Sequence, residues 1–153
     1  ADGGFEIIDI SAQVATDWKF AGAAVATNGK VVFAPAVADV IGVFDPADDS
    51  FRVVDISAHF TAYWGIVWKF HGAAAATNSS KVIFAPYGVN FVGVFDAADD
   101  SFELIDISKH VTRGFHFNGA VTAANGKIVF VPLNADGVGL FDPADNSFVL
   151  FDI

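Results

Sequence analysis

The chain has 153 residues, of which 54% are hydrophobic and 17 are phenylalanine, and its formal net charge is −10 at pH 7. This composition excludes a disordered chain, and the absence of cysteine excludes a disulfide framework, a thiolate nucleophile and a cysteine-based metal site. Only eight basic residues are present, which argues against nucleic acid and anionic lipid as partners because both require clustered lysine and arginine.

Three short sequence runs recur in the same order along the chain. They are a small apolar run (19–24, 69–74 and 116–121), a Gly-x-Phe-Asp run (42–45, 93–96 and 139–142) and a run ending in Asp-Ile (54–56, 105–107 and 151–153). The Asp of the third run also occurs early, as Asp9, so its successive copies lie 46, 51 and 46 residues apart. A period of this length, built from short apolar runs, is typical of a propeller blade.

The chain begins inside a repeat, because residues 1–5 match residues 47–51 and 98–102. We therefore expect a single repeat domain over residues 1–153. It starts with the outer strand of a preceding blade within residues 1–10, and continues with blades at 11–56, 57–107 and 108–153.

The middle unit illustrates the strands expected in every blade. Apolar segments at 70–77, 81–86, 91–96 and 102–107 are separated by turn sequences, which predicts a four-stranded antiparallel meander. The first turn is written Asn28-Gly29 and Asn125-Gly126 in the other copies, and Asn-Gly between apolar runs is the strongest short hairpin signal. The Gly-Ala-Ala segment should be the innermost strand, where only small side chains fit.

The fold class predicted is therefore all-β, with three propeller-type blades and a spare N-terminal outer strand at residues 5–10. Phenylalanines on the second and third strands should pack between blades, because a blade buries both faces against its neighbours; these are Phe33, Phe84, Phe130, Phe44, Phe95 and Phe141. Three blades are too few to close a ring. Three explanations are therefore open. Two or more chains associate into a ring of six or nine blades, the sequence is part of a longer array, or another protein covers the open blade faces.

The repeats resemble β-propeller blades of the kelch, NHL and virginiamycin-B-lyase-like groups. The resemblance rests on Phe70-His71-Gly72, on the hairpin sequence 28–33 and on the Gly-Val-Phe-Asp-Pro run at 42–46. Repeat arrays of uncharacterised microalgal proteins are also similar. In lyase-like propellers a histidine at the mouth of the inner strand and a metal carry the chemistry, and His71 holds that position here, whereas the equivalent residues are Ala21 and Asn118.

The connection from the outer strand to the next inner strand is longest and most aromatic in the middle repeat. It contains His59, Phe60, Tyr63, Trp64 and Trp68. An aromatic platform on one face of a propeller would stack on sugar rings or on the side chains of a partner. The alternative is that Trp64 and Trp68 cap the blade as part of its core.

A second candidate site lies at the start of the inner strands. Lys19, Lys69 and His116 precede these strands, and His71 and Asn118 follow two positions later. In a propeller these positions crowd the mouth of the central channel, where a ring of Lys and His would hold an anion. The alternative is that the lysines cap the rim and His71 is an ordinary polar residue.

Acidic residues recur in the turn after the third strand, as in Asp48-Asp49-Ser50 and Asp99-Asp100-Ser101. Oxygen-rich turns bind calcium in some proteins, but this spacing is not that of a calcium loop. Asp-Asp-Ser is also good turn chemistry by itself, and we favour that interpretation. We therefore expect no metal site, no catalytic residue and no cofactor.

The sequence predicts a non-catalytic binding or scaffold propeller that assembles into a larger ring or serves as a peripheral subunit, with itself or another propeller subunit as partner. A lectin-like carbohydrate binder is the first alternative, and a lyase- or hydrolase-like enzyme using His71 and a metal is the second. No apolar stretch approaches the roughly 18 residues of a membrane helix, so we expect no membrane span. The chain opens at Ala1 and lacks methionine, so we expect that upstream residues were removed. This favours a secreted or organelle-lumen location over others without fixing the compartment.

Overall fold

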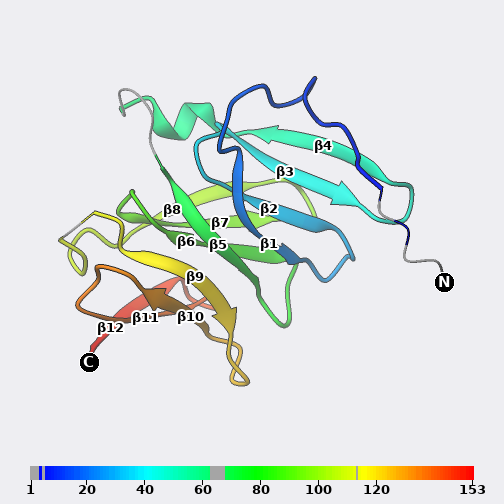
Figure 1. Ribbon diagram of the computed structural model, residues 1–153. Helices are drawn as coiled ribbons and strands as arrows, with labels where there is room; N and C mark the ends of the chain where they lie inside the picture. Colours follow the sequence, from blue (N-terminus) through cyan, green and yellow to red (C-terminus); the bar gives the residue numbers. More distant parts are fainter. Residues whose placement is uncertain (1–3, 5, 63–67, 113) are drawn as a thin grey trace.

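Three separate four-stranded sheets make up the protein (Figure 1). The computed structural model describes residues 4, 6–62, 68–112 and 114–153. In each sheet the strands pair in chain order and every neighbouring pair is antiparallel. The predicted all-β fold of three four-stranded antiparallel blades is confirmed.

Each sheet is one blade. Blade 1 comprises β1 (Phe20–Val25), β2 (Val31–Pro35), β3 (Val40–Asp45) and β4 (Ser50–Asp55). Blade 2 comprises β5 (Phe70–Ala75), β6 (Lys81–Pro86), β7 (Phe91–Asp96) and β8 (Phe102–Asp106). Blade 3 comprises β9 (Phe117–Thr122), β10 (Ile128–Pro132), β11 (Gly137–Asp142) and β12 (Ser147–Asp152). A short 3₁₀ helix, η1 (Ser57–Phe60), follows blade 1, and no helix among the described residues is long and apolar enough to cross a membrane.

The turns form as the sequence predicts. Gly29 and Gly126 adopt φ of +84° and +83° in the first hairpin of blades 1 and 3, a conformation that glycine reaches without strain. In the second turn an aspartate accepts the backbone N–H of the serine two residues later, at 3.1, 3.0 and 3.0 Å for Asp48, Asp99 and Asp145. Hydrogen bonds from that serine's hydroxyl and N–H hold the pKa of each carboxyl below its usual value. These acidic groups therefore complete turns.

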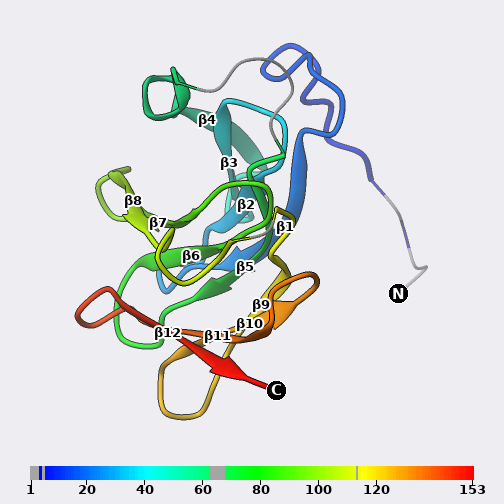
Figure 2. The ribbon, with the colours of Figure 1, turned by 90° about the vertical axis from the view of Figure 1, so that its left-hand side faces the viewer.

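The inner strands β1, β5 and β9 lie side by side and bring three glycines into contact (Figure 2). A Cβ atom on Gly22 would lie 2.7 Å from the Cα of Gly72, and one on Gly72 would lie 2.5 Å from the Cα of Gly119. All three residues have positive φ, at +95°, +103° and +137°. This glycine seam sets how closely the blades approach, and it confirms the Gly-Ala-Ala segment as innermost.

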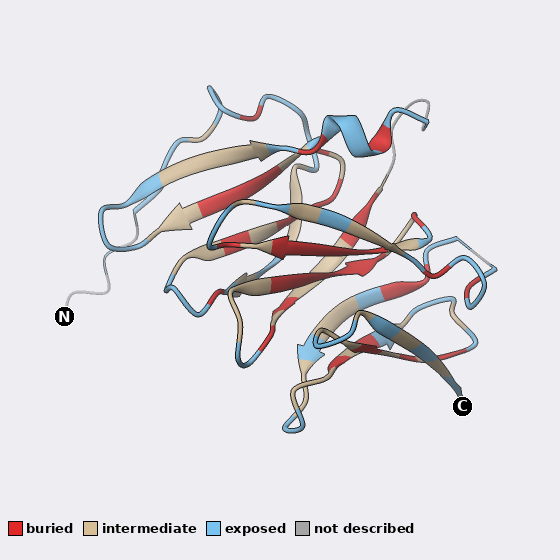
Figure 3. Ribbon diagram, turned by 180° about the vertical axis from the view of Figure 1, so that it is seen from behind, coloured by how far each residue is buried: buried red, intermediate tan, exposed pale blue. Residues whose placement is uncertain are grey.

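The hydrophobic core lies between blades. Phe70, Phe84 and Phe95 of blade 2 are fully buried beneath Val54 and Ile56 of blade 1. The same arrangement recurs one blade later, with Ile105 and Ile107 over three phenylalanines of blade 3, namely Phe117, Phe130 and Phe141. Figure 3 shows buried residues running through the strands of the middle sheet, which has a blade on either side.

Blade 1 has no sheet in front of it, and the predicted strand at residues 5–10 does not form. Phe5 lies outside the described residues, and residues 6–10 take no strand conformation. A strand needs a paired neighbour, and no described strand pairs with this segment. Glu6, Ile8 and Ile10 instead line a groove of about 380 Å³ over the phenylalanines of blade 1, namely Phe20, Phe33, Phe44 and Phe51. Phe33 and Phe44 are therefore only half-buried, in contrast to the other predicted core phenylalanines.

Candidate functional site

The residue two positions before each inner strand is aromatic, and it is exposed in blades 1 and 3 and half-buried in blade 2. The carbonyl oxygens of Trp18, Trp68 and Phe115 each accept a backbone N–H from the loop after the second strand of the same blade, at 3.0, 2.9 and 3.2 Å. Trp18 and Phe115 have φ of +53° and +58°. Bulky residues rarely take this left-handed conformation, which costs about 1–3 kcal/mol and concentrates at functional positions.

These side chains form a continuous series across the three blades. The ring centroids of Trp18 and Trp68 are 5.3 Å apart, those of Trp68 and Tyr87 are 6.4 Å apart, and those of Tyr87 and Phe115 are 4.8 Å apart. The ring of His71 lies 5.3 Å from that of Tyr87. Trp18 is 70% exposed and Phe115 is 46% exposed. We call Trp18, Trp68, Tyr87 and Phe115 the aromatic row.

The channel-mouth lysine of blade 2 lies inside a blade interface. Lys69 is 2% exposed, and its Nζ donates to the carbonyls of Val37 and Ala38 at 2.8 and 3.2 Å. The same Nζ forms an ion pair with Asp39 at 2.8 Å and lies 5.3 Å from the centroid of the Phe60 ring. This cation is fully engaged by protein groups of blade 1 and η1.

His116 holds the same place one blade later. Its Nε2 lies 2.8 Å from the Oδ1 of Asn90 in blade 2, and its buried Nδ1 has no hydrogen-bond partner. Burial lowers the pKa of His116 below its usual value. The remaining predicted mouth residues are Lys19, which donates to the carbonyl of Thr16 at 2.7 Å, the half-buried His71 and the exposed Asn118. Lys69 and His116 thus link blades, and of the five predicted residues His71 lies beside the aromatic row, against Tyr87.

The buried imidazole of His116 predicts a pH-dependent stability. Since burial disfavours the imidazolium, the unfolded state binds more protons between the two pKa values, and the free energy of unfolding falls as the pH decreases below the ordinary histidine pKa of about 6.5. The stabilisation is fully present above the unfolded pKa and is lost as the pH falls through the folded pKa. Urea unfolding at several pH values measures this slope. The variant His116→Gln should flatten it and exposed His110→Gln should not, and an equal slope in all three proteins would refute the assignment.

The predicted aromatic loop is only partly described. Tyr63 and Trp64 lie outside the described residues. Phe60 is buried at 5% exposure, and the ring of exposed His59 packs 5.1 Å from that of Phe102. Trp68 belongs to the aromatic row.

The sequence interpretation missed three members of the row as site residues. Trp18 and Phe115 align with Trp68 in the repeats, and that alignment was the available signal. Tyr87 follows the proline that ends the second strand, where the other copies have Ala36 and Leu133, so no repeated aromatic marks its position.

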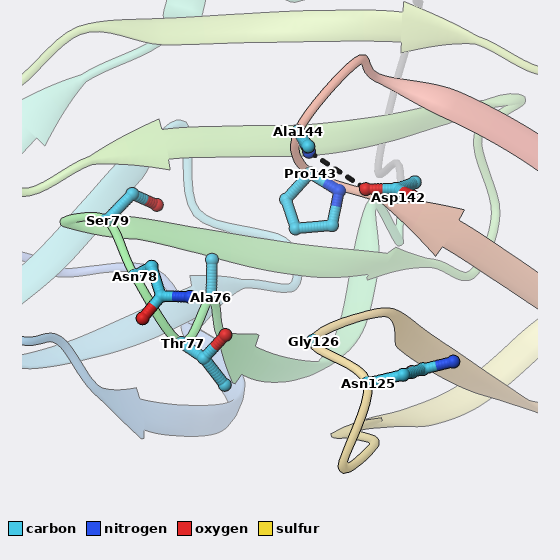
Figure 4. A pocket seen from close by; sticks show the side chains of 9 residues that line it. All are labelled: Ala76, Thr77, Asn78, Ser79, Asn125, Gly126, Asp142, Pro143 and Ala144. Atoms are coloured by element: carbon cyan, nitrogen blue, oxygen red, sulfur yellow. Dashed lines mark hydrogen bonds between the residues drawn. The ribbon is translucent and has the colours of Figure 1, made fainter.

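A groove of about 250 Å³ lies between the turns of blades 2 and 3 (Figure 4). Its one charged lining side chain, Asp142, accepts the N–H of Ala144 at 3.0 Å and pairs with Lys127 at 3.2 Å. Between blades 1 and 2 a side-chain bond joins the equivalent turns, from Asn28 Nδ2 to the carbonyl of Ala97 at 2.9 Å. Within the described parts of the chain, no three His, Cys, Asp or Glu side chains are grouped to hold a metal ion. The aromatic row is therefore the stronger candidate site.

Comparison with known proteins gives the fold. No protein-family model and no curated protein matches the chain. Among solved structures, a catalytically inactive virginiamycin B lyase from Staphylococcus aureus with quinupristin matches with a TM-score of 0.70 and 12% identity, over 92% of this chain and 43% of that one. A streptogramin B lyase matches with a TM-score of 0.61 and 18% identity, over 88% of this chain and 41% of that one. The WD40 repeats of RRP9 match with a TM-score of 0.61 and 11% identity, over 86% and 36%.

The chain thus spans less than half the length of each of these neighbours. At such identities the likeness establishes architecture alone. It agrees with three consecutive four-stranded sheets that bury phenylalanines between them around a seam of inner strands. The chain consists of three consecutive blades of a β-propeller-type repeat fold.

Proposed function

We propose that the chain is a non-catalytic binding propeller, completed by further blades, in which the aromatic row is the ligand surface. The observation that carries the proposal is Trp18, which is 70% exposed, held in a left-handed backbone conformation and placed 5.3 Å from Trp68. Exposed tryptophans are normally few, and this one begins a series of rings across three blades. A strained residue that presents a large apolar ring to solvent supports a role in contact with a partner.

Carbohydrate is the ligand class that this surface matches best. Aromatic faces carry negative potential, and the flat C–H face of a sugar ring is apolar and slightly positive. Exposed Asn118, at the start of the innermost strand of blade 3, and half-buried His71 offer hydrogen-bonding groups for hydroxyls. The net charge of −10 disfavours phosphate-bearing ligands.

A binding role has more support than the lyase- or hydrolase-like alternative. Catalysis by His71 and a metal would need acidic or histidine partners from neighbouring blades at the channel mouth. His71 packs against the ring of Tyr87, and the described residues bring together no group of three candidate metal ligands. The histidine of blade 3, His116, faces Asn90 within a blade interface.

Binding to a glycan array, followed by titration of tryptophan fluorescence with the best glycan, tests this function. We expect Trp18→Ala to weaken binding at least about tenfold, because it removes the most exposed ring of the row. Ile7→Ala is the matched control, since Ile7 is an exposed apolar residue outside the row, at 77% exposure. Binding by Trp18→Ala at the wild-type affinity, or no binding to any glycan on the array, would contradict the proposal.

A further inference from the structure

We infer that the partner of the open blades is a second copy of this chain, with blade 3 of each copy packed against blade 1 of the other. In this arrangement β12 takes the place over blade 1 that residues 6–10 hold in the single chain. The inference rests on the proposed completion of the propeller by further blades, and it names the source of those blades. Residues that hold the same place in successive repeats are called equivalent residues.

The two blade interfaces within the chain use the same polar contacts at the inner strand. The N–H of Lys69 donates to the carbonyl of Ala36, and the N–H of His116 donates to that of Tyr87, both at 2.8 Å. The side chain of Lys69 pairs with Asp39 at 2.8 Å, and that of His116 contacts Asn90 at 2.8 Å. Blades 2 and 3 therefore each direct a Lys or His side chain at an Asp or Asn of the blade before.

The outer strands repeat a second contact. Arg52 in β4 pairs with Asp100 of blade 2 at 2.7 Å, and Glu103 in β8 accepts a hydrogen bond from Asn146 of blade 3 at 3.1 Å. In both interfaces the residue after the first phenylalanine of the outer strand thus faces the second turn of the next blade. With the glycine seam, these contacts define one interface used twice.

The open face of blade 3 carries the apolar part of the same interface. Ile56 and Ile107 are each 1% exposed because they insert into the next blade, whereas their equivalent Ile153 is 85% exposed. Phe151, which is equivalent to Val54 and Ile105, is 54% exposed. Further exposed apolar side chains of blade 3 are Val121, Val131, Leu133 and Val149. Monomeric proteins rarely leave so many large apolar side chains of one sheet in water.

Blade 1 presents the matching surface at the other end of the chain. Its groove already holds Ile8 and Ile10, which are the equivalents of Phe151 and Ile153. These two isoleucines come from a segment with no strand pairing, and Ile8 is still 40% exposed. The larger Phe151, carried on a four-stranded sheet, covers the half-buried phenylalanines of blade 1 more completely.

Charge also favours the exchange. Glu6 is the equivalent of Arg52 and Glu103, and Asp49 is the equivalent of Asp100, so an N-terminal segment in the register of an outer strand would set Glu6 against Asp49. In that register the N-terminal segment would bring two negative charges together, whereas β12 would place the uncharged Val149 there. At the inner strand, Asp136 of one copy would meet Lys19 of the other, because they are the equivalents of Asp39 and Lys69.

Two copies give six blades, within the four to eight that closed propellers typically use, and three copies would give nine. A two-copy ring contains the new interface twice, related by a two-fold axis, and leaves no blade face open. The occupant of each open blade face is thus a blade of one second copy, in a stated register.

Sedimentation velocity on the 153-residue chain measures its mass in solution. We expect a dimer, and we expect Phe151→Asp combined with Ile153→Asp to yield a monomer that keeps the wild-type circular dichroism spectrum. A charge exchange then tests the register. Lys19→Asp and Asp136→Lys should each weaken the dimer at least about tenfold by placing like charges together, and a mixture of the two variants should restore it. In the mixed dimer both interfaces pair opposite charges, one through the unchanged Lys19 and Asp136 and the other with the two charges exchanged. Ile7→Asp is the matched control, because Ile7 is exposed and does not line the groove.

Each outcome has a distinct meaning. A monomeric wild type overturns the inference, and glycan binding by that monomer through Trp18 would leave the proposed ligand surface standing. If the protein stays oligomeric after the substitutions at Phe151 and Ile153, or if the mixture of charge variants does not form the dimer, the head-to-tail register is overturned and only self-association remains. A trimer overturns the two-copy ring.

Discussion

Replacing Gly72 with alanine is expected to lower the free energy of unfolding by at least about 4 kcal/mol or to prevent folding. The new Cβ atom would lie 2.5 Å from the Cα of Gly119 and 3.0 Å from the N of Ala120, both of which are backbone atoms that no rotamer change can move. The φ of +103° is strained for alanine as well. Urea unfolding followed by tryptophan fluorescence measures the change.

Gly29→Ala is the matched control for this substitution. Gly29 also has positive φ, at +84°, but nothing lies within 4 Å of the place that its Cβ atom would take. Only the conformational part of the penalty remains there, about 1–2 kcal/mol. Similar losses in the two variants would show that the glycine seam is set by backbone conformation and not by the contact between inner strands.

Lys69→Ala is expected to lower the free energy of unfolding by about 2–4 kcal/mol, the second large effect. The substitution leaves the carbonyls of Val37 and Ala38 without their lysine donor inside a blade interface, and it removes a buried side chain from the ring of Phe60. Chemical unfolding measured as for Gly72 gives the loss. Lys69→Met, which keeps the apolar stem, should recover part of it.

The chain supplies its own control at the equivalent position of blade 1. Lys19 is more exposed and donates to the carbonyl of Thr16 on its own loop, so Lys19→Ala should change stability by no more than about 0.5 kcal/mol in the monomeric state. The monomeric variant that carries the substitutions at Phe151 and Ile153 provides that state. Equal effects of the two lysine substitutions would contradict the role assigned to the blade interface.

The blades could be predicted from the sequence because short local sequence signals identify each strand and turn, and these signals recur in all three repeats. Asn28-Gly29 marks a hairpin, Pro35 and Pro86 mark strand ends, and the Gly-Ala-Ala segment marks the crowded inner strand. Alternative interpretations of one copy are excluded by the other two. The boundaries of the central strands β6 and β7 agree with the predicted segments.

The candidate site was less predictable because it depends on how one blade packs on the next. Lys69 and His116 look like mouth residues in the sequence, and only the register between blades directs them to Asp39 and Asn90. Trp18 and Phe115 are exposed and have left-handed backbone angles. The residue type does not predict such angles at a position that is not glycine. Residues 6–10 carry the sequence of a strand but lack the neighbour that would make them one.

Both blade interfaces in this molecule use the same set of side-chain positions. A whole repeat can therefore be gained or lost during evolution without the need for a new kind of contact. Duplication of a gene segment that encodes one repeat of about fifty residues would add a sheet whose two faces already match those of its neighbours. The side chains at these equivalent positions can differ between interfaces, as Lys69 and His116 do.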